Sequence, residues 1–193
     1  MAIAHSLVSS LNRDLVSDIM FETTGTFSQS ITVEADDSQV TGSSWQSAPA
    51  YNYLVFGEYA YGGPHYSMFS FSTGGAIPRY ATIVSASLTV QVNSTNGSPD
   101  FDVGCQAIDA AAQPSALNNP DAVTWTMTTN KTTRTDSPAD DSLTPILLAS
   151  SVQEIVNRAG WDEGRINIFT SDNSALGSAS HNWLVNDMDV GNT

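Results

Sequence analysis

The sequence predicts an all-β fold, a sandwich or barrel built from short strands. Runs rich in Val, Ile, Thr, Tyr, Phe and Trp follow one another from residue 27 onward, and this composition favours strands. Clusters of Gly, Pro, Asn, Asp or Ser bound each run, as turns between strands require. The runs, in chain order, are SITVEADD, YNYLVFGEYAY, HYSMFSFS, ATIVSASLTVQVN, DVGCQAID, AVTWTMTT, RINIFTS and HNWLVND.

The segment IVSASLTVQV has the clearest strand alternation. Its apolar positions are Val84, Ala86, Leu88, Val90 and Val92. A period of two residues places these side chains on one face of a strand, so we expect one buried and one wet face. The Ser-, Thr- and Asp-rich stretch 128–143 is instead predicted to be a long surface loop.

The N-terminal residues follow a different period. Between residues 3 and 20, apolar side chains recur at every fourth position, the spacing of one face of an amphipathic helix. These positions are Ile3, Leu7, Leu11, Leu15 and Ile19. We predict that residues 1–27 form an N-terminal arm whose apolar stripe contacts a partner protein, and that residues 28–193 form one β-sandwich domain.

One short helix interrupts the strand pattern at about residues 151–159. Ser151 and Glu154 have the spacing of a capping box, and Gly160 offers a left-handed stop. The apolar positions are Val152, Ile155 and Val156. Because so short a helix is marginal on its own, we expect it to pack over an open end of the sandwich, with Trp161 as an aromatic latch.

The charge of the chain is strongly negative. It has 20 Asp and Glu against 6 Lys and Arg, a formal net charge of −14. Because Lys and Arg provide the affinity for phosphates, this balance disfavours nucleic acid and an anionic membrane surface. No stretch approaches the roughly 18 apolar residues of a membrane span, and the N-terminus lacks the basic region of a signal peptide. We therefore expect a soluble chain with no nucleic-acid or membrane partner.

The residues that usually carry catalysis form no recognised motif. His5, His65 and His181 stand far apart, in no metal-ligand spacing. The single cysteine, Cys105, lies in a strand-like run and is predicted to be a buried small hydrophobe. A triad of His181, a nearby Asp and one of many serines would fit almost any serine-rich chain. We expect no catalytic residue, no metal and no cofactor, and therefore no enzyme.

Two kinds of binding site remain open. Flat aromatic rings with polar edges suit sugar rings, so Tyr59, Tyr61 and Trp183 are candidate sugar contacts; the alternative is that they fill a core or an interface. Pairs of Asp supply the hard oxygen ligands that calcium accepts; the alternative is that they are solvated loop carboxylates. These pairs are Asp36-Asp37, Asp100-x-Asp102 and Asp187-x-Asp189.

Two segments resemble a known family. They are HYSMFSFSTGGAIPRYATIVSASLTVQV, which contains F-x-F, I-P and A-T-I-x-S-A-x-L-x-V, and SSVQEIVNRAGWDEGRINIF. Over roughly residues 30–190 the chain resembles DNRLRE-type domains. The resemblance implies a jelly-roll β-sandwich, related to a carbohydrate-binding module family and also present in virion proteins of tailed viruses. It implies a module that binds or builds rather than a catalyst.

The resemblance, the arm and the missing export signal together predict a virion structural protein of a tailed virus. We expect a capsid decoration or cement protein on the outer surface of the particle, assembled in the host cytoplasm. The expected partners are the major capsid protein or other virion proteins. Self-association is also expected, because symmetric oligomers are common, with a trimer as the expected form. The alternatives are a carbohydrate-binding module and a tail or host-surface-binding component.

Overall fold

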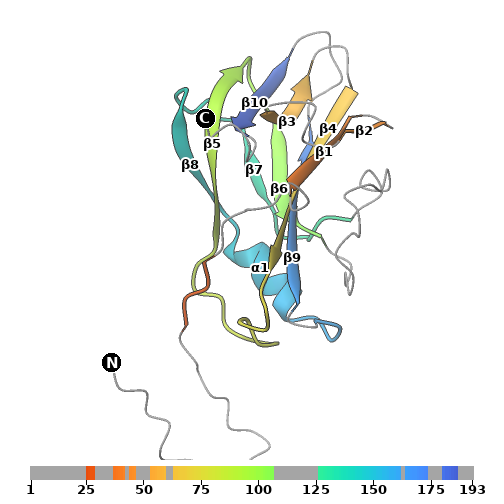
Figure 1. The fold of residues 1–193 in the computed structure, drawn as a ribbon, viewed down its shortest axis with the longest axis vertical. Coiled ribbons are helices and arrows are strands. Elements are labelled where there is room, and N and C mark those ends of the chain that lie inside the picture. Colours follow the sequence, from red (N-terminus) through yellow and green to blue (C-terminus); the bar gives the residue numbers. More distant parts are fainter. Residues whose placement is uncertain are drawn as a thin grey trace, which may run out of the picture.

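The described part of the chain is all-β with one short helix (Figure 1), which confirms the predicted fold class. The strands are β1 (Asp37–Thr41), β2 (Ser44–Gln46), β3 (Tyr53–Tyr59), β4 (Gly63–Ser72), β5 (Ser87–Asn96), β6 (Phe101–Cys105), β7 (Thr132–Arg134), β8 (Ser142–Leu147), β9 (Arg165–Asp172) and β10 (His181–Asn186); the helix is α1 (Ala149–Val156). The computed structural model describes residues 25–28, 37–41, 44–46, 53–59, 63–106, 126–161, 164–173 and 180–186.

Eight strands form one antiparallel path, in the order β7-β6-β9-β4-β3-β10-β5-β8. The path turns back on itself at β4. His65 of β4 pairs with both β3 and β1, and Met68 of β4 pairs with both β1 and β9. A strand has only two edges, and β1 occupies one edge of β4. Strands β3 and β9 must therefore pair with the other edge, at different positions along its length. The path therefore divides into two four-stranded halves, one on each side of the β3–β4 hairpin.

The two halves meet through an aromatic core. Phe56 of β3 lies 5.6 Å from Phe101 of β6 and 5.8 Å from Phe69 of β4, ring centre to ring centre, both edge to face. Trp183 of β10 stacks on Phe56 and meets Phe101 edge to face at 5.0 Å. Each such pair adds about 0.5–1.5 kcal/mol beyond the burial of its area. These four rings fix how the two halves face each other.

Strand β5 confirms most of the predicted alternation. Leu88, Val90 and Val92 are buried, and Ser, Thr and Gln between them are exposed. The prediction is wrong for Val84, which is 88% exposed because the strand begins only at Ser87. The stretch that precedes the strand is a loop that runs along α1, so the two-residue period no longer decides which side chains are buried.

Helix α1 lies toward one end of the sandwich, beside the lower part of β9 in Figure 1. Its predicted apolar face is confirmed: Val152, Ile155 and Val156 are buried in the main core. Trp161 follows as predicted, 8% exposed, and its indole N–H donates a hydrogen bond to the carbonyl oxygen of Ile77 at 3.0 Å. The helix and this latch close one end of the fold.

The predicted bounds of the helix, 151–159, are wrong. It starts two residues earlier, after Leu148, which makes no side-chain cap hydrogen bond. Ser151 and Glu154 do not form a capping box, because both bind the segment around Asn130 instead. The helix also ends at a right-handed Asn157, before Gly160. Tertiary contacts have taken over the polar side chains that would otherwise cap the first turn.

The two end strands of the path, β7 and β8, are joined by side chains instead of a strand ladder. The hydroxyl of Thr132 donates to the carbonyl of Leu147, and the guanidinium of Arg134 donates to the carbonyl of Pro145 at 3.0 Å. The same guanidinium lies 4.8 Å from the ring centre of Trp183. This contact, the closing seam, nearly closes the sheet and makes the fold barrel-like.

The stretch 128–143 is only partly the predicted loop. It contains β7, and Thr128 is 1% exposed because its hydroxyl accepts the N–H of Cys105 and donates to the carbonyl of Asn130. The predicted arm, residues 1–27, lies outside the described residues except for its last three. The boundary at residue 28 stays a prediction.

Candidate functional surfaces

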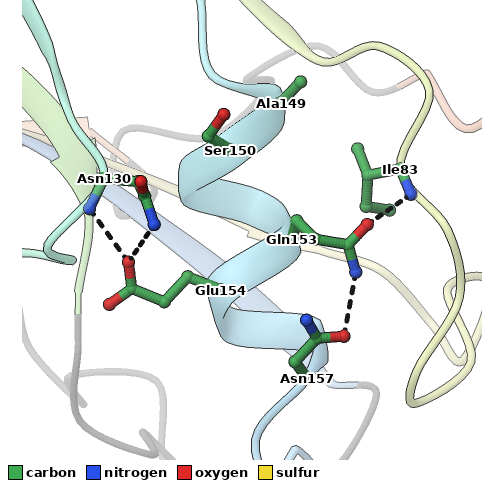
Figure 2. A pocket seen from close by; sticks show the side chains of 7 residues that line it. All are labelled: Ile83, Asn130, Ala149, Ser150, Gln153, Glu154 and Asn157. Atoms are coloured by element: carbon green, nitrogen blue, oxygen red, sulfur yellow. Dashed lines mark hydrogen bonds between the residues drawn. The ribbon is translucent and has the colours of Figure 1, made fainter.

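An open depression lies over the exposed side of α1 (Figure 2), with a volume of about 490 Å³. Three elements form it: α1 itself, the loop before β5 and the segment before β7. The lining residues are Ile83, Asn130, Ala149, Ser150, Gln153, Glu154 and Asn157. Five of the seven lining residues have polar side chains, so the depression can offer hydrogen bonds and a carboxylate to a ligand.

The carboxylate of Glu154 holds the segment before β7 onto the helix. It accepts the backbone N–H groups of Thr129 and Asn130, each at 2.9 Å, and the side-chain amide of Asn130. Partial burial alone would raise the pKa of Glu154, but these hydrogen bonds outweigh it and hold that pKa below its usual value. A carboxylate that accepts three hydrogen bonds from this segment has a structural role in joining it to the helix.

Gln153 holds the loop on the other side of the depression. Its carbonyl accepts the N–H of Ile83 at 2.8 Å, and its amide donates to the carbonyl of Ala81 and to the side chain of Asn157. Figure 2 shows Gln153 and Glu154 reaching in opposite directions from α1. The helix thus binds one segment on each side, and the depression is the gap between them.

A second polar cluster lies on β6. Asp102 is 1% exposed and forms an ion pair with Lys131 and a 2.6 Å hydrogen bond from Thr133. Burial alone would raise the pKa of Asp102, but Lys131, Thr133 and Asn173 together lower it. The pair fixes β7 against β6, and Lys131 is the only lysine of the chain.

We predict that Asp102→Asn lowers the free energy of unfolding by about 2 kcal/mol at pH 7, because charge-assisted hydrogen bonds are lost. The pKa of Asp102 in the folded state lies below the ordinary value of an aspartate, about 3.9. The carboxylate therefore contributes its stability above that value and loses it as the pH falls through the folded pKa. Urea unfolding from pH 7 to pH 2 should show the difference between wild type and variant shrinking below about pH 4.

Asp136→Asn is the matched control for this prediction. Asp136 forms an ion pair with Arg134, but its side chain is 53% exposed, so its loss should cost below about 1 kcal/mol. Equal costs for the two variants would contradict the structural role assigned to Asp102.

Cys105 and the two histidines that the structure describes are set by burial and by hydrogen bonds within the chain. Burial raises the pKa of the Cys105 thiol to about 12, so it carries no thiolate at neutral pH. Burial lowers the pKa of His65 to about 4. His181 accepts the backbone N–H of Ser98 at 3.1 Å at the start of β10. His5, and Asp187 and Asp189 of the hypothetical triad, lie outside the described residues.

The sugar platform suggested by the sequence fails at Trp183. Its side chain is fully buried in the aromatic core, and its indole N–H donates to the carbonyl oxygen of Asp136 at 2.8 Å. A ring with both faces covered cannot stack on a sugar. Tyr61 and the side chain of Tyr59 lie outside the described residues, as do the arm positions Ile3, Leu7, Leu11, Leu15 and Ile19.

The described part holds no group of three side chains suited to a metal ion. Of the three Asp pairs, only Asp100 and Asp102 lie wholly within that part, and Asp102 forms an ion pair with Lys131.

No helix among the described residues is long and apolar enough to cross a membrane.

One surface was not predicted from the sequence. On β8 the side chains of Thr144 and Ile146 are buried, and the residues that alternate with them are exposed. We call this the β8 outer face: Leu143, Pro145 and Leu147, with the two leucines 73% and 69% exposed. The polar–apolar alternation of this strand misleads, because its inward side chains include the polar Ser142 and Thr144, whereas its outward side chains are all apolar. The usable signal was the run of apolar residues itself, which also suits a strand covered on both sides.

Comparison with protein-family models, with curated proteins and with solved structures finds no match.

Proposed function

We propose that the protein is a non-enzymatic structural protein of a tailed-virus particle, a decoration or cement protein on the outer surface of the capsid. Its partners would be the major capsid protein or other virion proteins, with assembly in the host cytoplasm. The proposal joins the resemblance to DNRLRE-type domains, itself still a prediction, to the properties of the described surface.

The observation that carries the proposal is the β8 outer face. Large exposed apolar side chains grouped on one face are typical of protein–protein contact sites. The rest of the chain is strongly acidic, which keeps copies soluble and apart. A protein that coats a particle as a layer of associated copies needs one apolar contact face, together with an acidic remainder that limits contacts elsewhere.

The described polar groups support a structural role over a catalytic one. Glu154, Gln153 and Asp102 each hold a backbone segment or a neighbouring strand in place. Cys105 and His65 are buried with pKa values far from neutrality. Groups that carry out acid–base or nucleophilic chemistry are instead exposed to substrate with a pKa near the working pH.

The test is co-expression of the full chain with the major capsid protein encoded in the same genome, followed by sedimentation of the assembled shells. We expect the protein to travel with the shells in a fixed ratio and to be released by detergent or by denaturant before the shells dissolve. Shells that assemble and sediment without the protein would contradict a capsid role. Sedimentation with purified tails instead would place it on the tail.

Carbohydrate binding is a second candidate, favoured by the polar depression over α1. Amide and carboxylate groups can hydrogen-bond sugar hydroxyls, and Ser150 and Asn157 are exposed at its rim. A glycan array probed with the full chain tests it. Binding that is lost in Ser150→Leu but retained in Ser72→Leu, an exposed position on β4, would favour this candidate.

A further inference from the structure

The outer sides of β5 and β8 form one charge-free surface. Neither strand contains a charged residue. The β8 outer face stands directly opposite small polar residues of β5, with Leu147 beside Ser87 and Leu143 beside Gln91. In a chain with 20 Asp and Glu, two adjacent strands without charge reduce the repulsion that an approaching copy meets there.

The edge of β8 that faces the closing seam cannot accept another strand easily. Pro145 has no N–H to donate, and its carbonyl is bonded to Arg134. The next outward carbonyl, that of Leu147, is bonded to Thr132. Prolines and covered edges block the addition of a further strand. A segment that binds here must therefore pack on the face of the strands, because it cannot extend the sheet. This favours a helix over a further strand.

The N-terminal segment of the chain has the pattern that fits. Its stripe repeats every four residues from Ile3 to Ile19, and in a helix four residues rise about 6 Å. Outward side chains two apart on a strand are about 6.8 Å apart. A helix laid along β8 thus brings one stripe residue to each of Leu143, Pro145 and Leu147.

The charge of the segment also permits this contact. Residues 1–24 carry three of the chain's 20 acidic residues, Asp14, Asp18 and Glu22, together with Arg13. One Arg against three acidic residues gives the segment a net charge of −2, against −14 for the whole chain, so one arm meets less total repulsion from an acidic neighbour than a second sandwich would. If charge repulsion is the main barrier between copies, contact between an arm and a sandwich is therefore favoured over contact between two sandwiches.

The point where the arm leaves the sandwich suits this contact. Five residues, 20–24, join the stripe to the described residues 25–28, and five extended residues reach about 18 Å. In Figure 1 residues 25–28 lie toward the end of the sandwich that holds α1, and β8 runs into α1 through Leu147 and Leu148.

Resting on the proposed structural function, we propose that the outer face of β5 and β8 receives residues 3–19 of a second copy of this chain as an amphipathic helix. The contact links sandwiches through their arms. In self-assembly, the β8 outer face of one copy thus binds the arm of another copy.

The test uses three variants of the full chain, studied by light scattering. The buffer contains about 1–2 M NaCl, which screens the repulsion between copies because the Debye length is then roughly 3 Å or less. The face variant is Leu143→Asp with Leu147→Asp. The arm variant is Leu7→Asp with Leu11→Asp. The charge control is Ser72→Asp with Ala139→Asp, which adds the same charge at exposed positions elsewhere. We expect oligomers of the wild type and the charge control, and monomers of the face and arm variants.

Mixing the face and arm variants gives the decisive result. The mixture contains one intact arm and one intact face on different chains, so we expect association that neither variant shows alone. Absence of association in the mixture, or oligomers of the face variant alone, would overturn the inference. If the wild type binds shells in the sedimentation test but remains monomeric, the proposed function stands and this inference fails.

Discussion

Gly57→Ala is expected to destabilise the fold by about 4 kcal/mol, the sum of backbone strain of about 1–3 kcal/mol and overpacking of about 1–3 kcal/mol. Gly57 has a φ of +104°, and a Cβ there would lie 2.5 Å from the carbonyl oxygen of His181. The neighbouring strand cannot retreat easily, because Asn182 is fully buried and donates to the carbonyl of Glu58 at 2.7 Å. Urea unfolding followed by circular dichroism measures the loss.

Gly74→Ala is the matched control for this change. Gly74 has a φ of +56°, but nothing lies within 4 Å of its Cβ position. It should therefore cost only the backbone term, about 1–2 kcal/mol. If both variants unfold at the same urea concentration, the close approach of β3 and β10 at Gly57 is not a constraint in solution.

Trp183→Ala is expected to cost about 4–5 kcal/mol, the upper part of the range for removing a buried aromatic ring. The ring is fully buried between Phe56 and Phe101, and it also carries the contact with Arg134. Its loss therefore weakens both the core and the closing seam. The free energy of unfolding, together with the near-ultraviolet circular dichroism of the aromatic cluster, measures the effect.

Trp183→Phe separates the ring from its hydrogen bond. It keeps an aromatic ring in the core but removes the donor to Asp136, and should cost about 1–2 kcal/mol. An alanine variant no less stable than the phenylalanine variant would contradict the central place of this ring.

The sequence predicted strands well where one face is wet. Strand β5 shows this, because polar residues alternate with Leu88, Val90 and Val92. Strand β8 shows the opposite case: its outward Leu143 and Leu147 are apolar like its inward Ile146. Pro145 also argues against a strand, and the helix follows directly. Only the pairing with β5 makes this segment a strand.

Side-chain partners were harder to predict than strands. Ser151 and Glu154 match a local capping pattern, but they bind a segment more than 20 residues away in the sequence. Trp183 matches a sugar-binding pattern, but the fold places it at the centre of the core. A short motif cannot reveal which distant segment will compete for its polar groups. The arm and the Tyr61 site lie outside the described residues and stay predictions.

The scarcity of basic residues has a practical consequence for proteolysis. The described part contains five of the six, and each makes a contact within the chain: Arg79 with the carbonyl of Ala159, Lys131 with Asp102, Arg134 with Asp136, Arg158 with the carbonyl of Gln106, and Arg165 with Ser70. Trypsin must draw a basic side chain into its own specificity pocket. Cleavage at these five sites therefore requires the contact to open first, so tryptic cleavage within the described part reports local unfolding.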